Sequence, residues 1–98
     1  MPFLDFSAIA AQLPDTWKST RLGQVGPARI KVLRMDERAY EEETHDYNEG
    51  LLVVSGQLRL RIDAEEIRVQ AGQMYLVHAG TPHAVLAGSQ GTLVIIDV

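Results

Sequence analysis

The chain has 98 residues, a net charge of −4 with neutral histidines, and no cysteine. This length accommodates one domain, and the lack of cysteine excludes disulfides, thiolate metal sites and cysteine nucleophiles. The sequence contains no run of Lys or Arg of the kind that binds nucleic acid. No stretch approaches the ~18 to 20 apolar residues of a membrane span, and the N-terminus has no cationic signal segment. We therefore expect a cytoplasmic protein with no nucleic-acid or membrane partner.

Residues 1–16 are predicted to form an N-terminal arm with one short helix. Ser7 is of a type that caps helices and Pro14 of a type that ends them, so the helix is expected between these positions. Apolar side chains recur there at spacings of three and four and would form one face: Phe3, Phe6, Ile9 or Ala10, and Leu13. That face must pack either on the domain itself or on a partner chain.

From residue 17 onward, polar and apolar residues alternate with a period of two between turns that contain Gly, Pro or Asp. The pattern predicts nine short strands, at 17–25, 28–35, 40–44, 51–54, 58–62, 66–69, 74–77, 83–86 and 92–96. Short strands with frequent turns are typical of an all-β sandwich or barrel, so residues 17–98 are expected to form a single such domain. Gly56, Gly72 and Gly80 border these strands and are interpreted as hairpin positions with positive φ.

Seven of the thirteen acidic residues lie between positions 36 and 49. Such a segment is either a solvated acidic loop or a group of metal ligands. If it is extended, alternate side chains point to one face, and those that share parity are Glu43, His45, Tyr47 and Glu49. Charges that face a barrel interior are costly unless a cation compensates them, so the pattern is compatible with a metal site.

Two histidines occur further along the chain. His83 follows a Thr-Pro turn and is a candidate for a further ligand, whereas His78 is a weaker candidate that is more typical of a structural or rim position. The residues alone leave open whether these groups form a metal site or a rim of surface acids with incidental histidines. Arg59 and Arg61 alternate with apolar neighbours and are expected on the solvated face, although an arginine at a cavity mouth could bind an anion.

Residues 43–56 resemble the first motif of the cupin family. That motif has a His-x-His pair, then three or four residues, a Glu, six residues and a Gly. His45 matches the second His, Glu49 the Glu and Gly56 the Gly. Glu43 stands where the motif has its first His, which is a departure from the family pattern.

Residues 72–87 resemble the second cupin motif, Gly-x5-Pro-x-Gly-x2-His-x3-Asn. Gly72, Gly80 and His83 match it, while His78 replaces the Pro and Ala87 the Asn. The two motifs are separated by 15 residues, a spacing close to the minimum in small prokaryotic cupins, and the resemblance covers about residues 28–98. It implies a small antiparallel β-barrel, or jelly roll, with a metal held inside.

The resemblance implies that the metal ligands are Glu43, His45, Glu49 and His83. Two carboxylates and two imidazoles form a harder set than the usual three imidazoles and one carboxylate, which favours Mn, Fe or Zn, with Ni also allowed, over Cu. If Glu43 instead faced solvent, the site would have three ligands or be empty.

The resemblance leaves several functions open. One is a metal-dependent enzyme acting on a small organic molecule, because oxygenases, isomerases and lyases all occur in the family, and no catalytic residue can be assigned. The alternative is a non-catalytic module that binds or senses a small, sugar-like molecule with or without metal, and a third is a metal-free protein with a degraded site. We expect a homodimer, because the core is thin and both the apolar arm and the last strand offer surfaces to a second copy.

Overall fold

The computed structural model describes residues 3–98, in which one short helix precedes eight strands. The elements are α1 (Phe6–Ala11), β1 (Thr20–Val25), β2 (Ala28–Asp36), β3 (Tyr40–Glu43), β4 (Glu49–Ile62), β5 (Glu65–Gln70), β6 (Met74–Val77), β7 (His83–Val85) and β8 (Gln90–Asp97). All strand pairs are antiparallel, so the all-β prediction is confirmed. Within residues 3–98, no helix has the length and apolar character that crossing a membrane would require.

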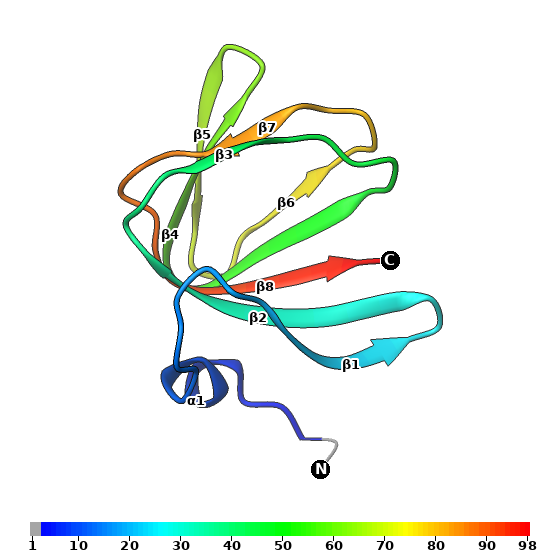
Figure 1. The fold of residues 1–98 in the computed structure, drawn as a ribbon, viewed down its shortest axis with the longest axis vertical. Coiled ribbons are helices and arrows are strands. Elements are labelled where there is room, and N and C mark those ends of the chain that lie inside the picture. The colour runs from blue at the N-terminus through cyan, green and yellow to red at the C-terminus, as the bar shows by residue number, and fades with distance from the viewer. Residues whose placement is uncertain (1–2) are drawn as a thin grey trace.

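The strands form one curled sheet in the order β1-β2-β8-β4-β7-β3, with β5 and β6 also paired to β4. Strand β4 is the longest, at 14 residues, and its two halves have different neighbours. The first half pairs with β8 and β6, and the second half pairs with β5 and β7. In Figure 1 the sheet therefore has two walls, one with β2 and β8 and the other with β3 and β7, and β4 runs through both.

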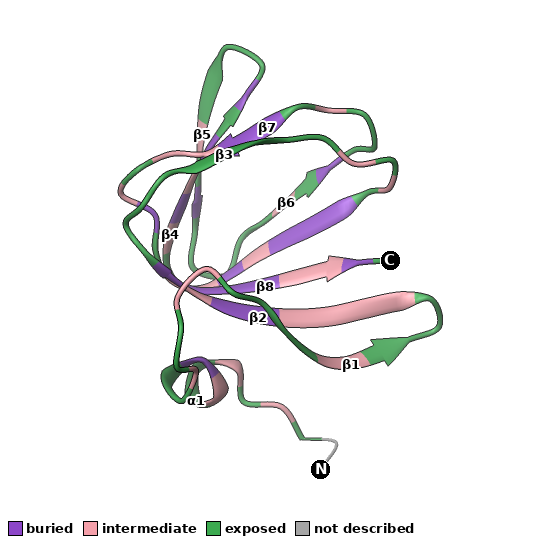
Figure 2. Cartoon of the chain, in the orientation of Figure 1, coloured by how far each residue is buried: buried purple, intermediate pink, exposed green. Residues whose placement is uncertain are grey.

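The alternation of side chains puts apolar residues on both faces of the wall formed by β2, β8 and the first half of β4. Leu33, Leu51 and Leu93 point into the barrel and belong to the main core. Val32 and Val94, one residue away from inward positions, point outward and pack beneath α1. A sheet covered on both faces explains the continuous apolar run Leu51–Val54, and Figure 2 shows the burial concentrated along these strands.

Helix α1 packs on this outer face of the same chain. Phe6, Ile9 and Leu13 contact the outer core around Ala10, so the arm covers its own domain. Phe3 does not take part, because 76% of its surface is exposed. The predicted cap at Ser7 is wrong: Asp5 is the N-cap, and its carboxylate accepts a hydrogen bond from the backbone N–H of Ala8.

The predicted hairpin at Gly56 is also wrong, because β4 is continuous through it. Leu51 and Val53 face inward before this point, whereas Leu58 and Leu60 face inward after it, so the inward parity changes. The pairing register with β8 shifts between Val53 and Ser55, which is the irregularity of a β-bulge. A bulge changes which alternate residues of a strand face inward, as a turn does. Unlike a turn, it bends the strand and does not reverse its direction.

Gly56 and Gly91 allow this bend because they face each other across β4 and β8. Gly56 has a φ of +79°, and a Cβ built on it would lie 2.0 Å from the carbonyl oxygen of Gln90. Gly91 has a φ of +107°, and its Cβ would lie 2.1 Å from the carbonyl oxygen of Ser55. Both obstacles are backbone atoms of paired strands, so neither can move aside without breaking the sheet.

Replacement of Gly56 by alanine is therefore expected to destabilise the fold strongly. Gly72 is the matched control, because its φ of +84° is equally positive but no atom lies within 4 Å of its would-be Cβ. Gly72→Ala should cost about 1 to 2 kcal/mol for the left-handed backbone alone, and Gly56→Ala should cost clearly more. Urea denaturation measures both free energies, and equal losses would contradict the proposed close approach.

Candidate metal centre

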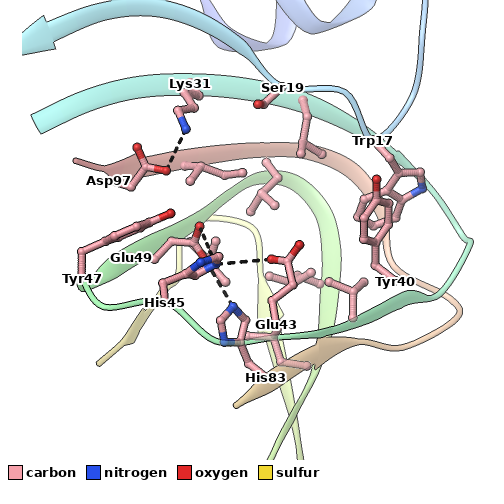
Figure 3. A pocket seen from close by; sticks show the side chains of 17 residues that line it. Trp17, Ser19, Lys31, Tyr40, Glu43, His45, Tyr47, Glu49, His83 and Asp97 are labelled. Carbon is pink, nitrogen blue, oxygen red and sulfur yellow. Dashed lines mark hydrogen bonds and ion pairs between the residues drawn. The ribbon is translucent and has the colours of Figure 1, made fainter. Parts of the chain in front are cut away.

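The curled sheet encloses a cavity of about 290 Å³ that is open on one side. Its floor and walls include leucines of β2, β4 and β8. Figure 3 shows polar side chains gathered in two groups in the same cavity. One group contains the histidines and two glutamates, and the other contains Lys31 and Asp97. The cavity therefore combines apolar walls with a few converging polar groups, which is typical of small-molecule sites.

Glu43, His45 and His83 each direct one potential ligand atom to a common point, with these atoms within 4.8 Å of one another. Glu43 ends β3 and is the cross-strand partner of His83, which begins β7. His45 follows β3, and its carbonyl accepts a 2.7 Å hydrogen bond from the N–H of Gly80 in the turn before β7. Backbone pairing thus brings together two segments that are distant in the sequence.

Glu49 approaches both imidazoles from the first position of β4. Its Oε1 lies 3.4 Å from Nε2 of His83, and its Oε2 lies 3.9 Å from Nε2 of His45. Glu43 reaches the same nitrogen of His45 from the other side, at 3.3 Å. The side chain of Glu43 is half exposed, and its carboxylate is directed toward His45 (Figure 3).

The orientation of His83 leaves one ring nitrogen free to act as a ligand. Its Nδ1 lies 3.0 Å from the carbonyl oxygen of Thr81, which can only accept, so Nδ1 carries a proton and the neutral tautomer of the ring has its lone pair on Nε2. A hydrogen bond of this kind on the remote nitrogen is what fixes metal-binding histidines in other proteins. His45 is held by stacking on Tyr47, with ring centroids 4.9 Å apart and planes 12° from parallel.

The Nε2 atoms of His45 and His83 are buried and have no hydrogen-bond partner within the described residues. Buried polar atoms are nearly always satisfied, so two unsatisfied imidazole nitrogens beside two carboxylates call for an explanation. The donor set of two nitrogens and carboxylate oxygens fits a divalent cation, which would satisfy all of these groups together.

Burial also changes the acidity of groups in this cluster. Burial raises the pKa of Glu49 above its usual range, although the two imidazoles oppose this effect. The phenol of Tyr47 has a raised pKa as well, first because of burial and then because of the charges of Asp97 and Glu49. Tyr47 is consequently a neutral hydrogen-bond donor beside the cluster at physiological pH.

The second polar group lies on the wall formed by β2 and β8, and no motif in the sequence predicts it. Nζ of Lys31 donates a 2.8 Å hydrogen bond to Oδ2 of Asp97, whose side chain is only 3% exposed. Arg29 adds an ion pair at 3.3 Å to Oδ1 of Asp97, although its geometry is not that of a hydrogen bond. Lys31 shares parity with the inward-facing Leu33, so the alternation of β2 already contained the signal.

The other candidates lie away from the cavity. His78 is exposed and does not line it. Arg59 forms two 2.9 Å hydrogen bonds with Glu66 on the outer side, and Arg61 is exposed, so neither is available to an anion in the cavity.

Trp17 and Tyr40 line a different part of the cavity, with ring centroids 5.4 Å apart. The indole N–H of Trp17 donates to Asp36, which also accepts hydrogen bonds from Thr16 and Arg38. The hydrogen bond from Arg38, together with those from Thr16 and Trp17, holds the pKa of Asp36 well below its usual range. Asp36 therefore remains an anionic anchor for the segment that carries Trp17.

Comparison with known proteins identifies the family. The sequence model of the cupin domain matches residues 32–98, so the chain belongs to the cupin family. No curated protein matches the chain. The resemblance stated from the two motifs is thereby confirmed, and the curled antiparallel sheet is the jelly-roll fold of that family.

Several solved structures share the fold. A cupin-2 domain containing protein from Shewanella frigidimarina is 22% identical and has a TM-score of 0.87, with 95% of this chain and 91% of that chain covered. A protein from Neisseria meningitidis is 18% identical, with a TM-score of 0.85 and 98% of both chains covered. A conserved protein of unknown function from Streptococcus pyogenes is 26% identical, with a TM-score of 0.81, covering 98% of this chain and 85% of that one.

The raised pKa of Glu49 predicts a stability effect in metal-free protein. A carboxyl whose pKa is higher in the folded state stabilises the fold at low pH and loses this contribution as pH rises through the folded pKa. Glu49→Gln, which cannot ionise, should therefore raise the melting temperature at pH 7 in the presence of chelator. The gain should shrink on acidification, where the wild-type carboxyl also becomes neutral.

Thermal melts at pH 7 and at pH 4 check this expectation. Glu41→Gln removes an exposed carboxylate from β3 and serves as the control, with no expected change. A Glu49→Gln protein that is less stable than wild type at pH 7 without metal would contradict the assignment of Glu49 as a costly buried charge.

Proposed function

We propose that the protein binds one divalent transition metal ion through Glu43, His45, Glu49 and His83, and holds a small organic molecule against it in the cavity. The two buried Nε2 atoms support this function most directly, because they face carboxylate oxygens at 3.3 to 3.9 Å without forming a hydrogen bond within the described residues. A metal ion between them would coordinate the two Nε2 atoms and the buried carboxylate of Glu49, and would compensate the cost of burying these three groups.

The donor set supports a metal of intermediate hardness. Two imidazoles and two carboxylates suit Mn, Fe or Zn, and also Ni, better than Cu. Such an ion, when bound, supplies a Lewis acid that polarises an oxygen of the ligand. The residues of the chain contribute the rest: Tyr47 as a neutral donor beside the cluster, and apolar walls that the ligand would contact.

The cavity supports a small ligand. Its volume of about 290 Å³ lies at the lower end of the ~300 to 1,000 Å³ range of ligand pockets. Leu33, Leu58 and Leu60 are among the residues that line it, so the body of the ligand would contact aliphatic carbon.

The homodimer stays a prediction. One reason for it has disappeared, because the apolar face of the arm packs on its own domain. Another surface supports a dimer: Met74, Leu76 and Val98 are exposed apolar side chains that line a second hollow, on the outside of β6 and β8. Apolar side chains gathered in this way are typical of interfaces.

Protein purified without chelator is expected to contain about one transition metal ion per chain by elemental analysis. The double variant His45→Ala with His83→Ala should lose this metal, because it removes both nitrogen ligands. His78→Ala is the control, since His78 lies in the adjacent turn but is exposed and outside the cavity. Unchanged metal content in the double variant would show that the metal is bound elsewhere or is adventitious.

Replacement of Glu43 tests the role of the residue that departs from the family motif. Glu43→His restores three imidazoles and one carboxylate, so metal content should persist while the preference shifts from Mn towards Cu and Ni. Competition between Mn and Ni, measured by elemental analysis after dialysis, gives this preference. Glu42→His, on an exposed neighbour, should leave the preference as it is in wild type, and an identical response of both variants would exclude Glu43 as a ligand.

A further inference from the structure

Lys31 is a half-buried cation inside the cavity that the metal centre does not use. Its side chain is 20% exposed, and it lines the cavity on the wall opposite β3 and β7 (Figure 3). An ammonium group has three N–H donors, and within the described residues only one of them has a partner, Asp97. Two donors are left for a molecule in the cavity.

Asp97 does not need Lys31 as its sole counter-charge. The guanidinium of Arg29 lies 3.3 Å from Oδ1 of Asp97, on the other side of the carboxylate from Lys31. Two cations therefore share one buried anion, which leaves one positive charge in excess on this wall. Arg29 does not line the cavity, so the excess charge is presented to the cavity by Lys31.

The sign of the charge in the whole cavity depends on the metal. With neutral histidines, the charged side chains that line the cavity (Glu43, Glu49, Asp97 and Lys31) carry two net negative charges, and Arg29, which contacts Asp97 from outside the cavity, reduces this to one. A divalent ion changes this to one net positive charge. An anion would thus be repelled by the metal-free cavity and attracted by the metal-loaded one.

We propose that the ligand of the cavity is a small monocarboxylate, with its carboxylate on the ammonium of Lys31 and a neutral oxygen function at the metal cluster. This inference rests on the proposed metal site and adds the class of ligand. A single excess charge matches a monoanion, and the small volume with leucine walls matches a short aliphatic acid better than a phosphorylated compound. Lys31 is then the residue that selects acids over neutral analogues.

The test compares acids with their neutral amides. Zinc-loaded protein is titrated calorimetrically with glycolate, 3-hydroxypropionate and 4-hydroxybutyrate, and with the corresponding amides. At least one acid should bind about tenfold more tightly than its amide, as a charge-assisted hydrogen bond provides. The preference should disappear in chelator-treated protein, where the cavity is negative.

Substitutions then separate the role of Lys31 from a purely structural ion pair. Lys31→Met should abolish the preference while the zinc content stays at the wild-type value, and Lys31→Arg should retain it. Lys18→Met, an exposed lysine outside the cavity, controls for the net charge of the protein. If Lys31→Met does not fold, Lys31→Met with Asp97→Asn removes the pair without changing net charge and should also lose the preference.

The outcomes distinguish the two proposals. An acid preference that survives Lys31→Met, or the absence of any preference in zinc-loaded wild type, overturns the role of Lys31 and leaves the metal site intact. A protein that takes up no zinc at His45 and His83 overturns the proposed function, and the inference about Lys31 with it.

Discussion

The close approach of β4 and β8 at Gly56 and Gly91 is the constraint on which the rest of the structure depends. Because neither position can hold a Cβ, the two backbones come close enough for β4 to bend without leaving the sheet. The bend lets one strand serve both walls, with Glu49 at one end and Leu58 and Leu60 beyond the glycine. The accompanying change of parity keeps the apolar side chains directed inward along the whole strand. A cavity with charged groups on facing walls is the direct result.

The site concentrates polar groups that would be unfavourable one at a time. Glu49 is buried beside two imidazoles, and its raised pKa records the cost of burying its charge. The backbone fixes this arrangement: the N–H of Gly80 donates to His45, and that of Ala79 donates to the side chain of Asn48. Since these bonds do not involve the proposed ligand atoms, the segment that carries His45 and Glu49 is positioned against the turn before β7 without an ion. Such preorganisation lowers the conformational entropy lost on binding.

Local patterns in the sequence were sufficient for the class of fold, because the alternation along β2, β5 and β8 depends only on neighbouring residues. They failed where a distant contact decides the conformation. The run Val54–Leu58 has the composition of a turn, and only its pairing with β8 shows that it continues as a bulged strand. Asp5 and Ser7 are both good cap residues, and packing of α1 on Val32 and Val94 selects Asp5.

The parity of Glu43, His45 and Glu49 indicated a common face, but the pairing of Glu43 with His83 is a property of the folded sheet. Lys31 and Asp97 were overlooked although both share parity with inward leucines, because a lone charge in an apolar strand carries no motif.

The position of Trp17 has a practical consequence. It is the single tryptophan of the chain, it lines the cavity, and its indole is anchored to Asp36 and tilted against Tyr40. Its backbone is held as well, by a 2.9 Å hydrogen bond to the carbonyl of Arg34. All tryptophan fluorescence of the protein therefore originates at the cavity wall, from a ring whose surroundings are otherwise fixed. The protein carries an intrinsic optical reporter of its own interior, and molecules entering the barrel can be followed by emission without any label.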